Sequence, residues 1–283
     1  MKSSKESERL VKRILVALDT SAHSMAALRA AAELAARLEA ELEGIFVEDE
    51  NLIRLASLSF VRQQEPFSAA RRRLELRQIE REMAVCARRL EQAFHSIAEE
   101  SDVQGTFRVV RGTVEEELLA AAIEADILFL GRAGHSPGRR HHMGSTARHA
   151  ALRASCATFV VRQGSALARP ILVVYDGSPS AQRALAVAAA FRIDMTEPLT
   201  ILLWAVDAQA EMQLRGEAAA WLRENGVAGQ FAEPLAADAA GLVQILRAQP
   251  CGTLVLPAGS GLLEEPELLH LAGEAVAPVL LVR

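Results

Sequence analysis

The chain has 283 residues, of which 51% are hydrophobic and 24% charged, and its formal net charge is −5. This balance is typical of a soluble globular protein, and the length allows two domains of about 100–200 residues each. The acidic charge gives no reason to expect nucleic acid or an anionic membrane as a partner.

One plan of apolar strands and alanine-rich helices occurs twice. In the first half, residues 13–18 predict a buried strand that ends at Asp19, and a helix follows it. In the second half, residues 170–175 predict the same strand, with Asp176 in the place of Asp19. Later strands are predicted at residues 42–47, 105–111, 127–130 and 158–162 of the first half, and at 199–206, 229–233, 253–256 and 279–283 of the second.

Short apolar strands that alternate with helices are typical of parallel sheets with helices on both faces. We therefore predict an α/β fold of two doubly wound parallel five-stranded sheets in series. The predicted domains are residues 1–162 and 170–283, and residues 163–169 form the linker between them.

The connection between the second and third strands is longer in the first half. Residues 51–67 are rich in apolar side chains and are broken by Pro66, and residues 68–99 predict one helix of about 48 Å. Its apolar spacing predicts packing on the sheet with an overhang, and a dimer contact or a lid is the alternative.

A glycine-rich loop follows the fourth strand of the first half. It begins with Gly131 and Gly134 and ends at Gly144, where Ser145 and Thr146 open a predicted helix. Glycines let the backbone approach a ligand closely, and a helix N-terminus offers N–H groups and partial positive charge to an anion. No acidic side chain occurs between Asp126 and Asp176, whereas the loop and its helix carry Arg132, His135, Arg139, Arg140, His141, His142, Arg148 and His149. The pattern predicts a phosphate-binding loop.

The spacing Gly131-x2-Gly134-x9-Gly144-Ser145 matches the phosphate-binding signature of ATP-binding universal stress proteins. The strand-end Asp19 and the closing strand Val-Val-Arg162 also resemble this UspA-like family. The similarity of plan covers essentially the whole chain, whereas the signature covers one loop.

This resemblance implies the strand order 3-2-1-4-5 in each half, which brings the ends of strands one and four to the same crevice. It implies ATP as the ligand of the first domain, with Mg²⁺ arriving on the phosphates and needing few protein ligands. Asp19 and Val47 would lie beside the adenine, although Asp19 as a helix-capping residue is the alternative. Gly131, Gly134, Gly144, Ser145 and Thr146 would hold the ribose and phosphates, and Arg132, His135, Arg139 and Arg140 add positive charge or hydrogen-bond donors.

The second half departs from this signature. After Leu256 the glycine spacing is lost, and Glu264, Glu265 and Glu267 stand where phosphates would lie. These negative charges would repel a nucleotide. We therefore predict one nucleotide site per chain and a degenerate second domain with a structural or regulatory role.

Catalytic chemistry is less well supported than binding. Residues 134–138 spell the G-x-S-x-G of a hydrolase elbow, but Ser136 lies deep in a long loop and Pro137 has no N–H for an oxyanion hole. The adjacent His141 and His142 lack the spacing of a zinc site. P-loop and dinucleotide fingerprints are also missing from the sequence. We expect a protein that is not an enzyme, with slow ATP hydrolysis left open.

The chain carries features of a cytoplasmic protein. Residues 1–12 lack the apolar run of a signal peptide, and no stretch reaches the ~20 apolar residues of a membrane helix. Cys86, Cys156 and Cys251 are far apart and form no Cys-x-x-Cys pair, so neither a disulfide framework nor a metal site is expected.

Two functions fit these features. The first is a regulatory protein in stress adaptation whose ATP occupancy is read by an unidentified protein partner, and the second is an interaction or scaffold protein that does not use the loop. Members of the resembled family often pair through their fifth strands. Here residues 158–162 beside 279–283 would make that pairing within one chain and cover two sheet edges, with a homodimer as a further option.

Overall fold

The computed structural model describes residues 11–57, 68–133, 143–191, 198–232, 252–259 and 264–283. The first half contains β1 (Arg13–Ala17), α1 (Ala22–Leu38), β2 (Glu41–Asp49), α2 (Glu50–Ser57), α3 (Ser68–Glu100), β3 (Gly105–Gly112), α4 (Val114–Ala122), β4 (Ile127–Gly131), α5 (Ser145–Arg153) and β5 (Ala157–Val161). The second half contains β6 (Ile171–Tyr175), α6 (Pro179–Ala190), β7 (Leu199–Leu203), α7 (Ala208–Glu224), β8 (Gly229–Phe231), β9 (Thr253–Pro257), α9 (Glu265–Glu274) and β10 (Val279–Val282).

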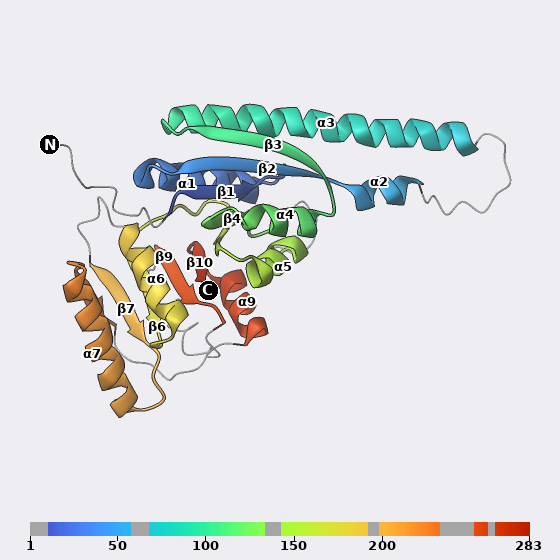
Figure 1. Ribbon diagram of the computed structural model, residues 1–283. Coiled ribbons are helices and arrows are strands. Elements are labelled where there is room, and N and C mark those ends of the chain that lie inside the picture. Colours follow the sequence, from blue (N-terminus) through green and yellow to red (C-terminus); the bar gives the residue numbers. More distant parts are fainter. Residues whose placement is uncertain (1–10, 58–67, 134–142, 192–197, 233–251, 260–263) are drawn as a thin grey trace.

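All ten of these strands lie in one sheet, in the order β3-β2-β1-β4-β5-β10-β9-β6-β7-β8 (Figure 1). Within each half the strands are parallel and follow the predicted order 3-2-1-4-5. The halves join where β5 pairs antiparallel with β10, with Phe159 opposite Leu280. The predicted pairing of the two fifth strands within the chain is thereby confirmed. The prediction of two five-stranded parallel sheets is right in the strand order of each half but wrong in the number of sheets, because this pairing removes both inner edges and makes one mixed sheet.

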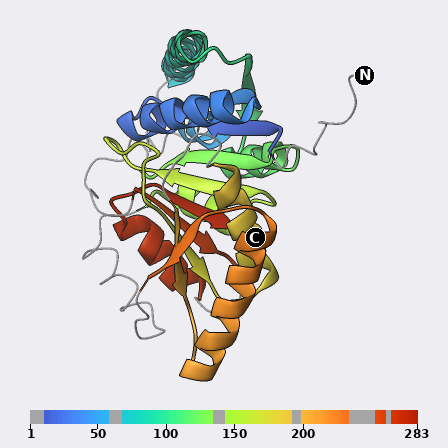
Figure 2. The same cartoon turned by 90° about the vertical axis from the view of Figure 1, so that its left-hand side faces the viewer.

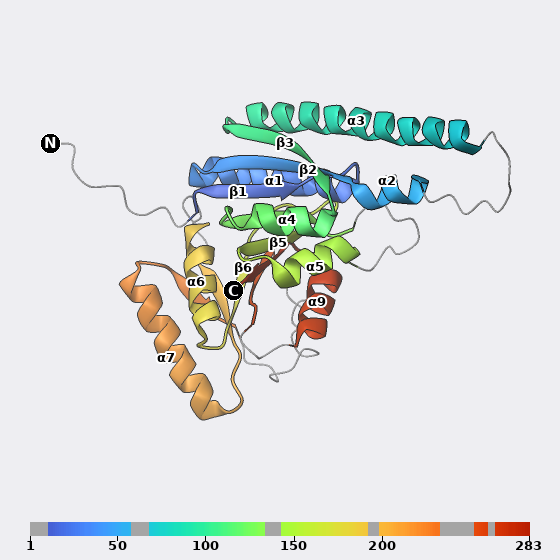
Figure 3. The same cartoon turned by 45° about the vertical axis from the view of Figure 1, so that its right-hand side comes forward.

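The two faces of the sheet are buried under different helices. Side chains alternate along each strand, so that Ile14 and Val16 enter one core cluster while Leu15 enters the other. The first cluster contains residues of α1, α3, α6 and α7, and the second contains residues of α4, α5 and α9. Both clusters run through both halves, and Figures 2 and 3 show the helices in these two layers. The expectation of helices on both faces is confirmed.

The long helix α3 packs on the sheet with only part of its length. Leu90, Phe94 and Ile97 are buried, and a Cβ added to Gly44 of β2 would lie 2.7 Å from a ring carbon of Phe94. The other end of α3 continues past the strands and contacts α2 (Figure 3). The predicted overhang is therefore present. Neither α3 nor any other helix in the described ranges is long and apolar enough to cross a membrane.

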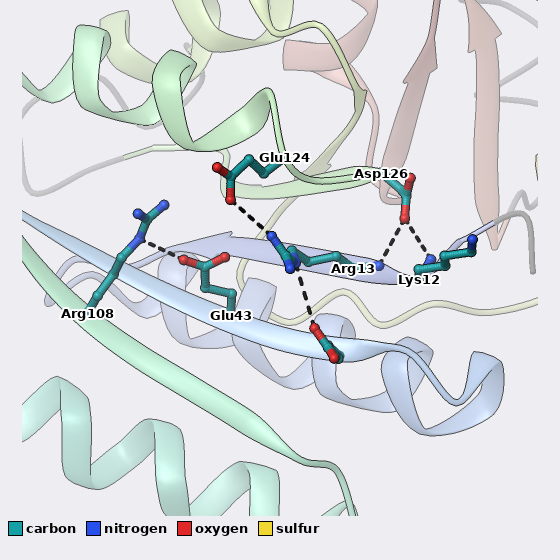
Figure 4. A network of polar contacts seen from close by, with 7 residues as sticks. Lys12, Arg13, Glu43, Arg108, Glu124 and Asp126 are labelled. Atoms are coloured by element: carbon teal, nitrogen blue, oxygen red, sulfur yellow. Dashed lines mark hydrogen bonds and ion pairs between the residues drawn. The ribbon is translucent and has the colours of Figure 1, made fainter.

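A polar network lies at the amino-terminal ends of the strands (Figure 4). The Asp126 carboxylate accepts the backbone N–H groups of Lys12 at 2.6 Å and of Arg13 at 2.9 Å, which attaches the start of β1 to the turn before β4. Arg108 of β3 pairs with Glu43 of β2 at 2.6 Å. Exposed ion pairs contribute about 0–1 kcal/mol each, so the backbone contacts matter more for strand register.

Candidate functional site

A pocket of about 670 Å³ opens where β1, β2 and β4 end. Ligands bind at this place in doubly wound sheets, because the winding reverses between the first and fourth strands. Several residues singled out in the sequence meet there: Asp19, Val47, Gly131, Gly144, Ser145 and Thr146 line the pocket.

Asp19 lies in the turn between β1 and α1. Its Oδ1 accepts the N–H of Ser21 at 2.9 Å, and its own N–H donates to Ser24 Oγ at 2.9 Å. Ser21 is the N-cap of α1 and accepts the N–H of Ser24 at 3.1 Å. Asp19 therefore builds the turn that starts α1 and also lies on the pocket wall, and a carboxylate has lone pairs left for a ligand.

Gly131 is required by a close approach of two backbone segments. A Cβ at this position would lie 2.7 Å from the N atom of Ser24 and 2.9 Å from the carbonyl carbon of His23. Both atoms belong to the backbone at the start of α1, so they cannot move aside as a flexible side chain would. The glycine thus lets β4 end directly beside the turn that carries Asp19.

The amino end of α5 forms another side of the pocket. Gly144 is its N-cap, no side-chain cap is found among the described residues, and the first turn contains no acidic residue. The N–H of Gly144 donates to the carbonyl of Arg132 at 2.9 Å, which ties the two ends of the glycine-rich loop together. The first N–H groups of a helix have no partners within it, so those of Ser145 and Thr146 are suited to an anion.

Arg132 is the predicted site residue that the structure places elsewhere. Its side chain is 4% exposed, and its Nη1 donates to the carbonyl of Gly273 in α9 at 2.5 Å. Burial lowers the pKa of Arg132, and the nearby charge of Arg162 acts in the same direction. The positive charge of the glycine-rich loop predicts a phosphate contact for Arg132. In the structure its side chain instead contacts α9 of the second half. Gly134, His135, Arg139 and Arg140 lie outside the described residues.

The pocket has a wall that the sequence did not assign to the site. Ile79, Met83 and Cys86 of the α3 overhang line it, together with Leu52 of α2. Their spacing in α3 is i, i+4 and i+7, so they form one stripe of the helix. The apolar spacing of that stripe is visible in the sequence, but only the structure shows that the stripe lies beyond the sheet and faces a pocket rather than a core. The remaining wall residues include Asp49, Glu82, Val114 and Leu118.

Metal-binding groups are not assembled in the part of the chain that the structure describes. No set of three or more His, Cys, Asp or Glu side chains there could hold a metal ion. His149, from the helix after the loop, instead has its Nδ1 3.5 Å from a carboxylate oxygen of Glu115.

The corresponding end of the second half has different side chains. The strand pairing of Ala17 with Ile45 in the first half matches that of Val174 with Leu202 in the second. Trp204 therefore occupies the place of Val47, and it is buried at 7% exposure. Pro257, the last residue of β9, occupies the place of Gly131.

Comparison with known proteins identifies a protein family and several solved structures that are similar to this chain. Residues 11–162 match the sequence model of the Universal stress protein family. Among solved structures, the chain is similar to a universal stress protein from Archaeoglobus fulgidus DSM 4304, with a TM-score of 0.72 and 17% identity over 95% of this chain and 97% of that chain. It is also similar to a functionally unknown protein from Pseudomonas aeruginosa PAO1, with a TM-score of 0.54 and 13% identity over 96% of this chain and 92% of that chain.

At these identities the structural matches establish the fold alone. Among curated protein sequences, none matches the chain. The family match, in contrast, extends over more than half of the chain and includes β1, β2, β4 and the start of α5, all of which contribute residues to the pocket. The chain belongs to the universal stress protein family.

Proposed function

We propose that the pocket of the first half binds an adenine nucleotide, with ATP as the expected ligand, and that its occupancy regulates the protein in stress adaptation. One observation carries this proposal: the amino end of α5, which has no acidic residue in its first turn and no side-chain cap among the described residues, opens into a pocket at the ends of β1, β2 and β4. Phosphate oxygens would accept the N–H groups of Ser145 and Thr146, and the helix dipole favours their negative charge.

The base and ribose would lie on the side of the pocket away from α5. Val47, Met83 and Ile79 offer apolar surface there, and the Asp19 carboxylate accepts hydrogen bonds from N–H or O–H groups. The preference for adenine rests on the glycine spacing that resembles ATP-binding members of the family. Mg²⁺ would be held mainly by the phosphates and water, since it commonly needs few protein ligands.

Binding rather than turnover is the proposed role. The described lining of the pocket contains the carboxylates Asp19, Asp49 and Glu82 but no histidine, lysine or arginine. Among these described residues, a histidine or lysine that could activate a hydroxyl or thiol nucleophile is therefore missing. Slow hydrolysis of bound ATP would be a side reaction, and partners would respond to the bound state.

The test replaces the N-cap of α5. Aspartate and asparagine are both good N-caps, so neither Gly144→Asp nor Gly144→Asn should destabilise the helix. Only aspartate adds a negative charge where phosphate would lie. Calorimetry with Mg-ATP should show one ATP per chain for the native protein and at least about tenfold weaker binding for Gly144→Asp, with a smaller loss for Gly144→Asn.

Melting temperatures of both variants show whether the fold is intact. Mass spectrometry of gently purified protein should release adenine nucleotide from the native chain and none from Gly144→Asp. Unchanged ATP affinity in the folded Gly144→Asp protein would contradict the proposed site, and two ATP molecules per chain would contradict the single site. Native protein that shows neither bound nucleotide nor an ATP-dependent melting shift would favour a nucleotide-independent interaction protein.

A further inference from the structure

The second half reaches across the junction to the carboxyl end of α5. Arg283, which follows β10, donates from Nη2 to the carbonyl of Ala151 at 2.7 Å and from Nη1 to the carbonyl of Ala154. Ala154 is the C-cap of α5. Carbonyls at a helix end have no partners within the helix, and a cation placed there also interacts favourably with the helix dipole.

A reciprocal contact runs from the first half to the second. Arg132 donates to the carbonyl of Gly273 near the carboxyl end of α9, while its backbone carbonyl accepts the N–H of Gly144. Its own N–H donates to the carbonyl of Val161 at 2.8 Å. One residue therefore connects both ends of the glycine-rich loop, the end of β5, and α9.

The surfaces between these two arginine contacts are packed. Met143 and Ala147, on either side of the amino end of α5, belong to the same core cluster as Leu268 and Leu271 of α9. The two helices are in contact, and Figure 3 shows α9 directly beside α5. The amino end of α5 is thus held by packing against the second half, and its carboxyl end by Arg283.

We infer that the second half is a positioning element of the nucleotide pocket, in which Arg283 and Arg132 fix α5 so that its amino end meets the ligand. This inference rests on the proposed function. A helix of this length is about 13 Å long and moves as a rigid body, so displacement of its carboxyl end displaces the N–H groups at the other end. A shift of about 1 Å at a binding group is enough to weaken a directed interaction.

The test uses three variants of the full chain. Arg283→Ala removes both contacts with α5, and Arg283→Lys retains the charge but not the two-pronged geometry. Leu222→Ala is the matched control, because Leu222 is a buried residue of α7 in the other core cluster and its truncation destabilises the second half without touching α5. Mg-ATP affinity is measured by calorimetry, and hydrogen exchange of the α5 amides is measured without nucleotide.

Arg283→Ala should bind ATP roughly three- to tenfold more weakly and should exchange the α5 amides faster, with Arg283→Lys between it and the native chain. Leu222→Ala should lower the melting temperature and change neither quantity. Unchanged ATP affinity in both Arg283 variants would overturn the inference, even if exchange of α5 becomes faster. An equal loss of affinity in Leu222→Ala would also overturn it.

The outcome can be separated from that of the proposed function. Native protein that fails to bind ATP would refute the nucleotide site itself. The exchange measurement needs no ligand, so it would still decide whether Arg283 fixes α5. Unchanged exchange in Arg283→Ala would then remove the structural basis of the inference as well.

Discussion

Helices α5 and α9 occupy corresponding places in the two halves, but they differ in the acidic residues at their amino ends. The N-cap of α5 is Gly144, and its first turn contains no acidic residue. The N-cap of α9 is Glu264, whose N–H donates to the Glu267 carboxylate at 3.0 Å, and Glu265 adds a further negative charge in the first turn. α9 therefore meets the positive end of its dipole with its own carboxylates, whereas the first turn of α5 has no carboxylate of its own.

The second difference is a side chain near the carboxyl end of the second strand of each half, Val47 within β2 and Trp204 directly after β7. Both side chains are buried in the core cluster that contains Leu256 and Leu268, but Val47 also lines the pocket of the first half, and the much larger indole of Trp204 fills the corresponding place in the second. The two halves share one strand order, because that order needs only apolar strands that alternate with helices and connections long enough to join them. The fold is therefore retained in both halves although the side chains at these corresponding places differ.

The largest expected effect comes from transferring the bulky side chain to the first half. Val47→Trp should place an indole in the pocket and weaken ATP binding by roughly 100-fold or more, which corresponds to about 2.7 kcal/mol. Calorimetry checks this result. Val47→Ile is the control, because it stays apolar and adds little volume, and it should bind ATP within about threefold of the native chain.

The reverse substitution, which removes the indole from the second half, tests the same difference between the two halves. Trp204→Val should lower the free energy of unfolding by about 3 kcal/mol, because it leaves a cavity in the core. It should not create a second ATP site, since Glu264, Glu265 and Glu267 remain at the start of α9. Native-like ATP affinity in Val47→Trp would show that this position does not distinguish the halves. A second ATP in Trp204→Val would show that the glutamates of α9 do not exclude a nucleotide.

The two strand-end aspartates provide a smaller and more closely matched comparison. Asp176 Oδ1 accepts the N–H of Ser178 at 2.9 Å, just as Asp19 Oδ1 accepts that of Ser21. Asp19→Ala and Asp176→Ala should each lower the free energy of unfolding by about 1 kcal/mol through loss of this turn contact. Only Asp19→Ala should also weaken ATP binding, by roughly tenfold.

Denaturant titration and calorimetry on the same two variants separate the roles of the aspartates. If Asp19→Ala retains native ATP affinity, Asp19 is a turn residue only, like its counterpart. If Asp176→Ala weakens ATP binding equally, the loss is a general effect of destabilisation and says nothing about the pocket.

Much of the fold is predictable because each strand carries its own burial pattern. Ile14, Leu15 and Val16 are all buried, and their run of apolar residues is enough to indicate a strand covered on both faces. Ends of elements are less certain: the strand predicted over residues 199–206 ends at Leu203. The joining of two sheets into one depends on antiparallel pairing of β5 with β10, strands more than a hundred residues apart, and no local pattern specifies it.

The pocket is predictable where its residues belong to a local motif, as with Gly144 and Ser145. The α3 wall is not, because the reach of the overhang depends on how α3 lies on the sheet rather than on its own sequence. Arg132 shows a different limit. A basic residue in a glycine-rich loop indicates an anion site, but the partner of its guanidinium is the carbonyl of Gly273, far along the chain. Side-chain direction is therefore decided by tertiary packing.

The smallest expected effect concerns a histidine that has no counterpart in the second half. His23 lies at the start of α1, where the corresponding residue of α6 is Ser180, and its Nδ1 accepts the N–H of Gln163 at 2.8 Å. Burial lowers the pKa of His23 below its ordinary value of 6.5. The charges of Arg132 and Arg162 act in the same direction, and Asp19 opposes them.

The sign of the pH dependence follows from this lowered pKa. Well above pH 6.5 the imidazole is uncharged in both the folded and the unfolded state, so His23 contributes no pH dependence there. As the pH falls through about 6.5, the unfolded chain takes up the proton first, and the folded state loses stability until the pKa of folded His23 is passed. Protonation of Nδ1 would also remove the acceptor that holds Gln163.

His23→Gln tests this prediction, because a glutamine oxygen can still accept the N–H of Gln163 but does not titrate. The free energy of unfolding is measured by urea titration at about pH 7.5 and pH 5 for both proteins. Carboxylates contribute equally to both, so the difference between the two proteins isolates the histidine. His23→Gln should lose less stability between these pH values than the native chain does. Equal losses would mean that His23 is protonated as readily in the folded protein as in the unfolded chain, and that its contacts with the two arginines have no energetic consequence.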